Sequence, residues 1–212
     1  MKKIWLIRHG KTKGNLERRY VGRTDEELLP STAERLKGYD VPLAEKVYVS
    51  PMKRCRQTAE ILFSQAVQIE IPAYRECDFG DYEYCNYEEL KDLPPYQKFL
   101  DTLGESGFPK GESRIEFQNR CLKGFDEMIA LERENAKDIF MVVHGGTIMA
   151  VLDRIILPHK AYYDWQIENG RGFIIEYDEG TMSGHLCGIF DGSASWRSPM
   201  DVAPGLRDRE NH

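Results

Sequence analysis

Short apolar runs, each followed by a turn or a helical pattern, restrict this chain to few fold classes. The run at 4–7 is continuous and ends in a polar, glycine-containing turn, as strands buried on both faces of a parallel sheet do. Further runs lie at 47–49, 67–71, 139–143, 173–177 and 186–190. The last two flank Asp178-Glu179-Gly180, which predicts a hairpin. With helices between the earlier runs, the pattern predicts a three-layer α/β fold, a mainly parallel sheet with helices on both faces.

Helix signals separate the first expected strands. The segment 31–34, Ser-Thr-Ala-Glu, has the spacing of a capping box and predicts a short helix that ends near Gly38. Another helix is expected over 52–63, because Pro51 precedes it and proline is favoured at a first helical position.

Two longer helices are expected in the second half of the chain. The segment 113–116 forms a further capping box, which predicts a helix to about Glu134. Its expected apolar stripe consists of Ile115, Leu122, Phe125 and Ile129. Residues 147–156 are nearly all apolar, so we expect that helix to be buried against the sheet.

One segment interrupts the alternation of strands and helices. Residues 77–110 are rich in tyrosine, proline and acidic side chains, and we interpret them as a small, mostly helical cap inserted over one end of the sheet. The tail at 195–212 has little periodicity and is expected to be loosely packed. The chain of 212 residues is therefore predicted to be a single domain.

The charge balance excludes several classes of partner. The chain has 29 Lys and Arg against 35 Asp and Glu, a net charge of −6, whereas nucleic acids and anionic membranes require a basic surface. No apolar stretch approaches the 18 residues typical of a membrane span. We therefore expect a protein that acts on a small molecule, with neither nucleic acid nor membrane as its partner.

Cysteine usage and the N-terminus suggest the compartment. The five cysteines are odd in number and include no Cys-x-x-Cys pair, so neither a disulfide framework nor a thiolate zinc site is indicated. Arg8 interrupts the first apolar run too early for a secretory signal peptide. The sequence predicts a cytoplasmic location.

Basic and imidazole side chains follow three of the expected strands. Arg8 and His9 follow the first strand, Arg54 comes shortly after the second, and His144 follows the fourth, ahead of two glycines. Ligands of open α/β sheets bind beyond the carboxyl ends of the strands, so these groups should converge. Arginines at a helix N-terminus favour an anion, and phosphate matches the planar guanidinium group best.

At these residues the chain resembles the histidine phosphatases, also called the phosphoglycerate-mutase-like superfamily. Five blocks carry the resemblance in the family's order: Ile7-Arg8-His9-Gly10 through Asn15, Ser50 through Ala59, Arg75 through Glu83, Gly111-Glu112-Ser113, and Val143-His144-Gly145-Gly146. A single tripeptide such as Arg-His-Gly is a weak signal, but five ordered blocks are a specific one.

The resemblance implies a mechanism. His9 would attack phosphorus as a neutral imidazole, its pKa lowered by the neighbouring arginines, and form a phosphohistidine. Arg8, Arg54 and a protonated His144 would hold the phosphoryl oxygens, with neither metal nor cofactor. Glu76 would be the general acid and base, with Asp78, Asp81 and Glu83 as competitors in the same acidic loop. Arginines should depress the pKa of Glu76, so we expect bound phosphate and burial under the cap to raise it.

Substrate-binding residues are also implied. Thr12, Asn15, Gly22, Arg23 and Gly145 are candidates, although Thr12 and Asn15 could instead cap a turn. Gly145, with its neighbour, either lets backbone amides approach the phosphate or starts a tightly packed helix. Cap aromatics could stack on an organic substrate or simply bury the cap.

The resemblance favours a phosphatase over a mutase. Mutases of the family carry a longer insertion with an arginine pair, which is missing from 77–110. The segment 20–25 resembles α-ribazole phosphatases and, more loosely, other small broad-specificity sugar-phosphate phosphatases. A small phosphorylated metabolite is therefore the expected substrate. Two departures are Tyr84, where the family usually has glycine, and the absence of the Gly-x-x-Gln-Ala motif after Leu29. A homodimer remains one candidate assembly.

Two alternatives lie outside this chemistry. A phospho-ligand binding module on a dead catalytic scaffold would lack at least one of the five catalytic residues, and all five are present. A metal site built from His9, His144 and acidic loop residues is the other alternative, and it predicts that a chelator abolishes turnover.

Overall fold

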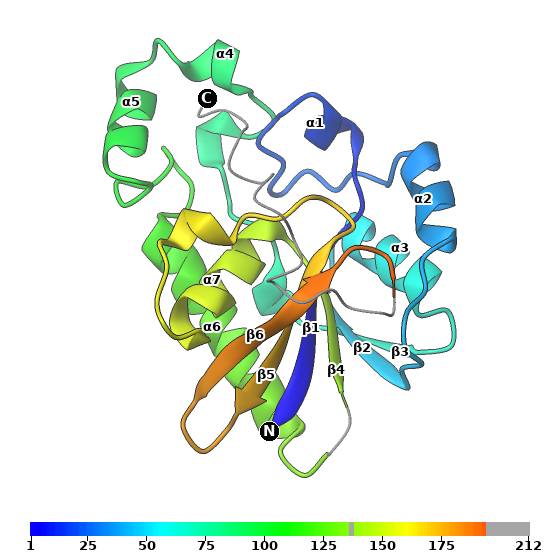
Figure 1. Cartoon of the computed structure of the whole chain (residues 1–212). Coiled ribbons are helices and arrows are strands. Elements are labelled where there is room, and N and C mark those ends of the chain that lie inside the picture. The colour runs from blue at the N-terminus through cyan, green and yellow to red at the C-terminus, as the bar shows by residue number, and fades with distance from the viewer. Residues whose placement is uncertain (136–137, 194–212) are drawn as a thin grey trace.

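A computed structural model describes residues 1–135 and 138–193. Its elements in chain order are β1 (Lys2–Arg8), α1 (Lys13–Leu16), α2 (Pro30–Lys37), β2 (Lys46–Val49), α3 (Lys53–Leu62), β3 (Val67–Glu70), η1 (Pro72–Tyr74), η2 (Gly80–Tyr82), α4 (Tyr87–Leu90), α5 (Pro94–Asp101), α6 (Arg114–Leu131), β4 (Ile139–Val143), α7 (Gly145–Ile155), η3 (Tyr162–Trp165), β5 (Gly172–Asp178) and β6 (Ser183–Phe190). The strands form one sheet that runs through the centre of the molecule (Figure 1). The expected tail at 195–212 lies outside the described residues.

The sheet has the strand order β3-β2-β4-β1-β5-β6. The first four strands of this order are parallel, β5 is antiparallel to β1, and β6 is antiparallel to β5. The prediction of a mainly parallel sheet with a terminal hairpin is therefore confirmed. Parallel pairing in the middle of the sheet places the carboxyl ends of β1, β2 and β4 at one edge, which is where the polar groups follow.

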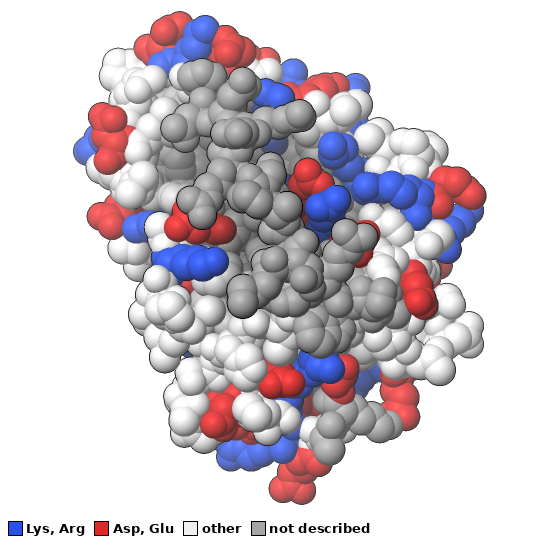
Figure 2. Space-filling view, viewed as in Figure 1, with Lys and Arg blue, Asp and Glu red and all other residues white. Residues whose placement is uncertain are grey.

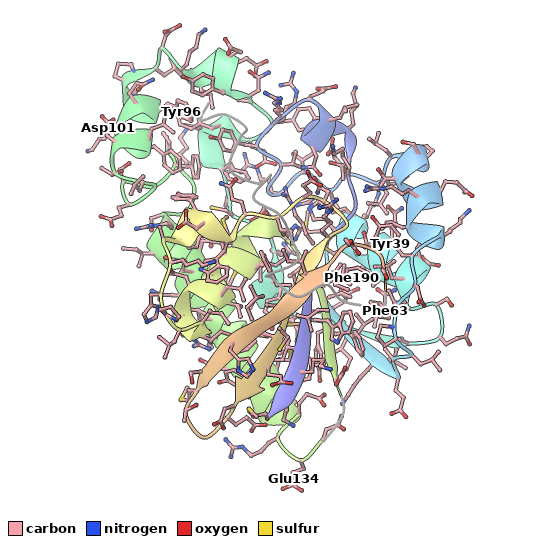
Figure 3. The ribbon with its side chains drawn as sticks, viewed as in Figure 1. Tyr39, Phe63, Tyr96, Asp101, Glu134 and Phe190 are labelled. Atoms are coloured by element: carbon pink, nitrogen blue, oxygen red, sulfur yellow. The ribbon has the colours of Figure 1, made fainter. Side chains whose placement is uncertain are left out.

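Two hydrophobic layers cover the faces of the sheet. On one face, side chains such as Ile4 and Met141 pack with Phe125 of α6 and Val151 of α7. On the other, Trp5 and its neighbours pack with residues of α2 and α3. Figure 3 shows three side chains of this second layer, Tyr39, Phe63 and Phe190, beside the sheet. These two layers and the sheet form the predicted three-layer α/β fold.

The helix boundaries correct two local predictions. The helix that we expected to open with a Ser31 capping box begins one residue earlier, at Pro30, and its N-cap Leu29 makes no side-chain hydrogen bond. Proline fixes the backbone angle φ for a first helical residue, and this outweighs the serine signal. The helix expected after Pro51 begins at Lys53, so Pro51 lies outside it. By contrast, Ser113 and Glu116 form the predicted reciprocal capping box of α6.

The buried face of α6 also differs from the expected stripe. Phe125 and Ile129 are buried as predicted, but Ile115 is half exposed. The most buried positions are Phe117, Cys121, Gly124, Phe125 and Met128. The N-terminal half of α6 turns toward the cap rather than the sheet, because Phe117 and Cys121 belong to the cap's hydrophobic cluster.

The insertion at 77–110 forms a cap above the carboxyl ends of the strands (Figure 1). Its regular elements are η2, α4 and α5. A cluster of aromatic side chains makes up its core, and Figure 3 labels Tyr96 within it. The rings of Tyr82 and Tyr96 meet edge to face, as do those of Phe79 and Phe108. The cap therefore has a hydrophobic core of its own, which joins the domain through α6 and α7.

Charged side chains of both signs lie on the face of the molecule that Figure 2 shows. On the face that Figure 2 shows, basic and acidic residues alternate rather than separating into patches of one sign. No helix among the described residues is long and apolar enough to cross a membrane.

Candidate active site

Strand pairing brings the predicted groups together at the sheet edge below the cap. Arg8, the last residue of β1, lies opposite Val143, the last residue of β4. The next residue of each strand is a histidine, and the backbone N–H of His9 donates to the carbonyl of Val143 at 2.9 Å. The rings of His9 and His144 meet edge to face, with centroids 5.1 Å apart. Arg54, in the first turn of α3, is fully buried beside them.

The hydrogen bonding of His9 determines which ring nitrogen can react. Nδ1 lies 2.7 Å from the carbonyl oxygen of Gly10. Because a carbonyl only accepts, Nδ1 carries the proton and Nε2 keeps the lone pair. Burial, followed by the charges of Arg54 and Arg8, lowers the pKa of His9 well below its usual range. His9 is therefore a neutral imidazole with the lone pair on Nε2, which is the ionisation state that the sequence predicted.

Two residues without a predicted role, Thr58 of the second block and Asn169, hold the backbone of His9 and Gly10. Thr58 accepts a hydrogen bond from the backbone N–H of Gly10 at 2.9 Å. Asn169 donates from its amide to the carbonyl of His9 at 3.2 Å. Asn169 lies 160 residues away in the chain and belongs to no recognisable block, so no sequence signal identifies it.

The two arginines retain unused donors. Nε of Arg8 and Nε of Arg54 are both buried without a hydrogen-bond partner among the described residues. Nη1 of Arg8 donates to the carbonyl of Ile167. Both outer nitrogens of Arg54 are occupied, Nη1 by the carbonyl of Thr24 and Nη2 by the carbonyls of Val21 and Gly22. Buried donors without partners are costly, so an oxyanion between these guanidinium groups would relieve the penalty.

His144 differs from the sequence expectation in its charge. Its Nε2 lies 2.8 Å from the hydroxyl of Ser50, and the sulfur of Cys55 lies 3.6 Å from the same atom. Burial and the nearby arginines lower the pKa of His144 well below its usual range, which favours the neutral ring. A neutral ring can still donate from Nδ1 when the Ser50 hydroxyl donates to Nε2.

The side chain of Glu76 lies beside His144. Its carboxylate is 14 % exposed, and Oε2 lies 3.9 Å from Nδ1 of His144. Burial raises the pKa of Glu76, and this effect exceeds the opposing hydrogen bond from the Cys77 N–H and the charges of the arginines. Burial is therefore the larger of the two opposing effects that the sequence indicated for Glu76. The competing carboxylates of Asp78 and Asp81 are more exposed and form ion pairs with basic side chains.

Arg120 holds the segment that carries Glu76 through hydrogen bonds to its backbone. From α6 it donates to the carbonyls of Ala73 and Arg75 at 2.8 and 2.9 Å, and to that of Glu76 at 3.3 Å. It also pairs with Glu112 at 2.6 Å, and Glu112 in turn accepts from the N–H of Asp78. Arg120 lies in the middle of a helix, with no sequence signal for this role.

The candidate substrate-binding residues occupy structural positions around the site. Thr12 and Asn15 form the capping box of α1, and Asn15 also accepts from Asn169 at 3.2 Å. The N–H of Gly22 donates to Glu83 at 3.0 Å, and the Arg23 guanidinium is 63 % exposed near Asp78. These contacts account for the four residues without a substrate, so their binding role stays a prediction.

The two glycines at the start of α7 have different surroundings. A Cβ atom on Gly145 would lie 3.3 Å from Nε of Arg8. On Gly146 it would lie 2.8 Å from both the Glu76 carboxylate and the Phe117 ring, closer than such contacts ever are. Gly146 therefore lets the acidic side chain approach the helix. His144 is the N-cap of α7 and makes no side-chain capping bond, so these first amides face the site at the positive end of the helix.

Tyr84, which stands where the sequence comparison led us to expect glycine, has a backbone conformation that favours glycine. Its φ of 65° lies in the left-handed region, which favours glycine. The side chain compensates, because its hydroxyl donates to Glu26 at 2.8 Å and its ring lies below the Arg19 guanidinium. Glu26 also accepts from the N–H of Gly14 in α1. The departure is thus accommodated at the edge of the site.

The fold and the site together define a phosphoryl-transfer enzyme with a histidine nucleophile. Sequence comparison agrees, since the profile of the histidine phosphatase superfamily (branch 1) matches residues 4–188. The chain belongs to this superfamily.

Relatives of known name lie within the same superfamily. The chain is 27 % identical to the broad-specificity phosphatase YOR283W of Saccharomyces cerevisiae, over 82 % of this chain and 79 % of the yeast protein. It is 26 % identical to the adenosylcobalamin/alpha-ribazole phosphatase of Escherichia coli, over 79 % of this chain and 86 % of that protein. The crystal structure of the alpha-ribazole phosphatase from Shigella flexneri shares the fold with a TM-score of 0.79, at 21 % identity, over 92 % of this chain and all of that one.

Proposed function

We propose that this protein is a phosphomonoester hydrolase that acts on a small phosphorylated metabolite through a phosphohistidine on His9. The observation that carries the proposal is the pairing of a neutral, Nε2-nucleophilic His9 with buried, unpartnered Nε donors on Arg8 and Arg54. A nucleophile and an anion clamp at one buried point are what phosphoryl transfer requires.

In the first step, Nε2 of His9 attacks phosphorus while the bond from phosphorus to the ester oxygen breaks. Glu76, whose pKa is raised by burial, gives a proton to that leaving oxygen. The guanidinium groups and the N-terminus of α7 stabilise the negative charge on the transferred group. His144 donates from Nδ1 to the same group.

In the second step, the Glu76 carboxylate takes a proton from a water molecule, which attacks phosphorus. The bond between phosphorus and Nε2 breaks, and inorganic phosphate leaves. Glu76 ends protonated and His9 neutral, so the cycle closes without any other reactant.

Trapping the intermediate tests this proposal. The enzyme is mixed with p-nitrophenyl phosphate, quenched in alkali and digested, and the peptide containing His9 is examined by mass spectrometry for one added phosphoryl group. We expect the modification on His9, with no phosphate on the His9→Ala variant and normal labelling of a His159→Ala control, since His159 is exposed and remote. Turnover of the His9→Ala variant at the native rate would contradict the proposal.

We further propose hydrolysis rather than mutase transfer, and the α-ribazole phosphatases as the nearest subfamily. Residues 77–110 contain no arginine pair to hold a second acidic group while a substrate reorients. The 20–25 segment and the named relatives support the subfamily. A hydrolysis screen that includes α-ribazole 5′-phosphate and 3-phosphoglycerate tests both points, with phosphate release separating hydrolysis from transfer.

The positive charge for catalysis comes from arginines, so we propose that the reaction needs no metal ion. Chelator should leave p-nitrophenyl phosphate hydrolysis unchanged, while vanadate, which resembles the transferring phosphoryl group, should inhibit. A non-catalytic phospho-ligand module would instead bind vanadate without any turnover.

A further inference from the structure

One group of side chains away from the active site has the donor set of a transition-metal ion. Among the described residues, Glu176, His185 and Cys187 each offer one ligand atom, and these atoms all lie within 4.8 Å of one another. Nε2 of His185 is 3.0 Å from a carboxylate oxygen of Glu176. None of these residues takes part in the chemistry proposed for His9.

The hairpin of β5 and β6 creates the cluster. Glu176 and His185 are directly opposite each other in the antiparallel pair, so their side chains leave the same face of the sheet. Cys187 comes two residues after His185, where the register shifts: Leu186 faces Ile175, but Gly188 faces Ile174. Cys187 is the extra residue of this bulge, and bulges re-aim side chains. The irregularity brings the thiol beside the other two donors.

We propose that Glu176, His185 and Cys187 bind a divalent transition-metal ion of the zinc class. A tetrahedral zinc site with bonds of about 2.0 to 2.3 Å has ligand atoms about 3.5 Å apart, so a movement of roughly 1 Å by flexible side chains completes three ligands. Thiolate and imidazole select zinc, cobalt or nickel over calcium and magnesium, which prefer oxygen ligands. His185 is 58 % exposed, so water can supply the fourth ligand.

Binding at this cluster must displace a proton. A cysteine coordinates a metal ion as its thiolate, so formation of the metal–sulfur bond at Cys187 releases the thiol proton to the buffer. One proton per metal ion is the expected stoichiometry from the cysteine.

The cluster is remote from the phosphate site. Lys3, the β1 partner of Glu176, precedes Arg8 by five positions, which corresponds to about 17 Å along the strand. A metal ion here would link β5 to β6 across the bulge without touching His9. Metal binding and metal-independent hydrolysis are thus compatible, and the inference stands apart from the proposed function.

Cobalt(II) titration of the reduced, chelator-treated full chain tests the proposal. We expect one equivalent to bind, with the near-ultraviolet charge-transfer band of a cobalt–thiolate bond, a rise in Tm, and displacement by zinc. Cys187→Ser should abolish the band and the release of its proton, and His185→Gln should weaken binding by about tenfold or more. Cys85→Ser and His159→Gln are matched controls, because Cys85 is another half-buried free thiol and His159 another exposed imidazole.

The outcomes separate the proposal from its alternatives. Absence of the band at millimolar cobalt, or an unchanged band in Cys187→Ser, overturns it. Circular dichroism of each variant shows whether the fold is retained. If Cys187→Ser does not fold, the loss of affinity in His185→Gln carries the test, since His185 is exposed. Hydrolysis of p-nitrophenyl phosphate should stay at the native rate in both variants.

Discussion

Oε2 of Glu76 lies 3.9 Å from Nδ1 of His144, and burial moves the pKa values of the two groups in opposite directions. The pKa of the carboxyl rises and that of the imidazole falls, so burial shifts both groups toward their neutral forms. This shift weakens the ion pair that a charged carboxylate and imidazolium would form at this distance.

Replacing this acid should make the rate depend strongly on the leaving group. We expect Glu76→Gln to lower kcat about 10²- to 10⁴-fold with an alkyl phosphate, and much less with p-nitrophenyl phosphate, whose leaving group needs little protonation. Steady-state kinetics with both substrates measure this. Asp81→Asn is the control, because Asp81 lies in the same loop but pairs with Lys110. Equal losses on both substrates would contradict the assignment.

The buried histidines should make the protein less stable in acid. His9 and His144 have folded-state pKa values well below 6.5, so below that pH the unfolded chain binds more protons than the native state. The free energy of unfolding should then fall with decreasing pH, by at most about 1.4 kcal/mol per pH unit for each histidine. The raised pKa of Glu76 acts in the opposite sense.

Urea unfolding at pH 7.5 and 5.5 measures this dependence. His9→Gln should lose less stability over that interval than the native protein, while His159→Gln should match the native protein. Identical slopes for all three proteins would show that the burial of His9 has no effect on its protonation.

Arg120 should act on catalysis through Glu76. Arg120→Lys keeps the charge but removes the planar group that reaches Glu112 and the backbone carbonyls. We expect kcat to fall by about tenfold with an alkyl phosphate, with little change in KM and a smaller loss with p-nitrophenyl phosphate. Arg154→Lys is the control, since Arg154 makes a similar two-pronged pair with Asp126 away from the site. A purely structural role would lower both rates equally.

Gly146 should tolerate no side chain. An added Cβ would meet the Glu76 carboxylate and the Phe117 ring at 2.8 Å, so Gly146→Ala should displace the acid and lower kcat by about 10² or more. Gly38→Ala should leave kcat unchanged, because its Cβ has an ordinary contact, 3.5 Å from the Arg35 carbonyl. Native kcat in Gly146→Ala would show that Glu76 need not approach α7.

Because Tyr84 has a left-handed backbone conformation, a glycine variant at this position should be more stable than an alanine variant. Tyr84→Ala loses the hydrogen bond to Glu26 and the contact with Arg19 but keeps the strained backbone. Tyr84→Gly loses the same contacts and removes the strain, so it should be more stable than Tyr84→Ala by about 1 kcal/mol. Thermal unfolding of both variants and of Tyr84→Phe, which loses only the hydroxyl, checks this. An alanine variant as stable as the glycine variant would show that position 84 relaxes.

The sequence could predict those parts of the molecule that depend on local pattern. Apolar runs locate the strands because a buried strand cannot carry polar side chains, and the ordered blocks point to His9, Arg8, Arg54 and His144 as groups that follow strand ends. Local signals compete with one another, however. The capping signal at Ser31 does not set the start of α2, which begins at Pro30. Ile115 was placed on the buried stripe of α6 because the sequence pattern does not show that this helix also contacts the cap.

The net charge of the chain also shows what the sequence can and cannot predict. A net charge of −6 argues against polyanionic partners, but it says nothing about the site, where Arg54 is fully buried and Arg8 is partly buried. Only tertiary structure decides that the lone pair of His9 is on Nε2, that the pKa of Glu76 is raised despite the arginines, and that Asn169 and Arg120 hold the backbone of these two residues. These properties arise from desolvation and from contacts between residues far apart in the chain, which have no local signature in the sequence. The sequence by itself determined which chemical groups are present and which strand ends carry them, whereas folding determined their protonation.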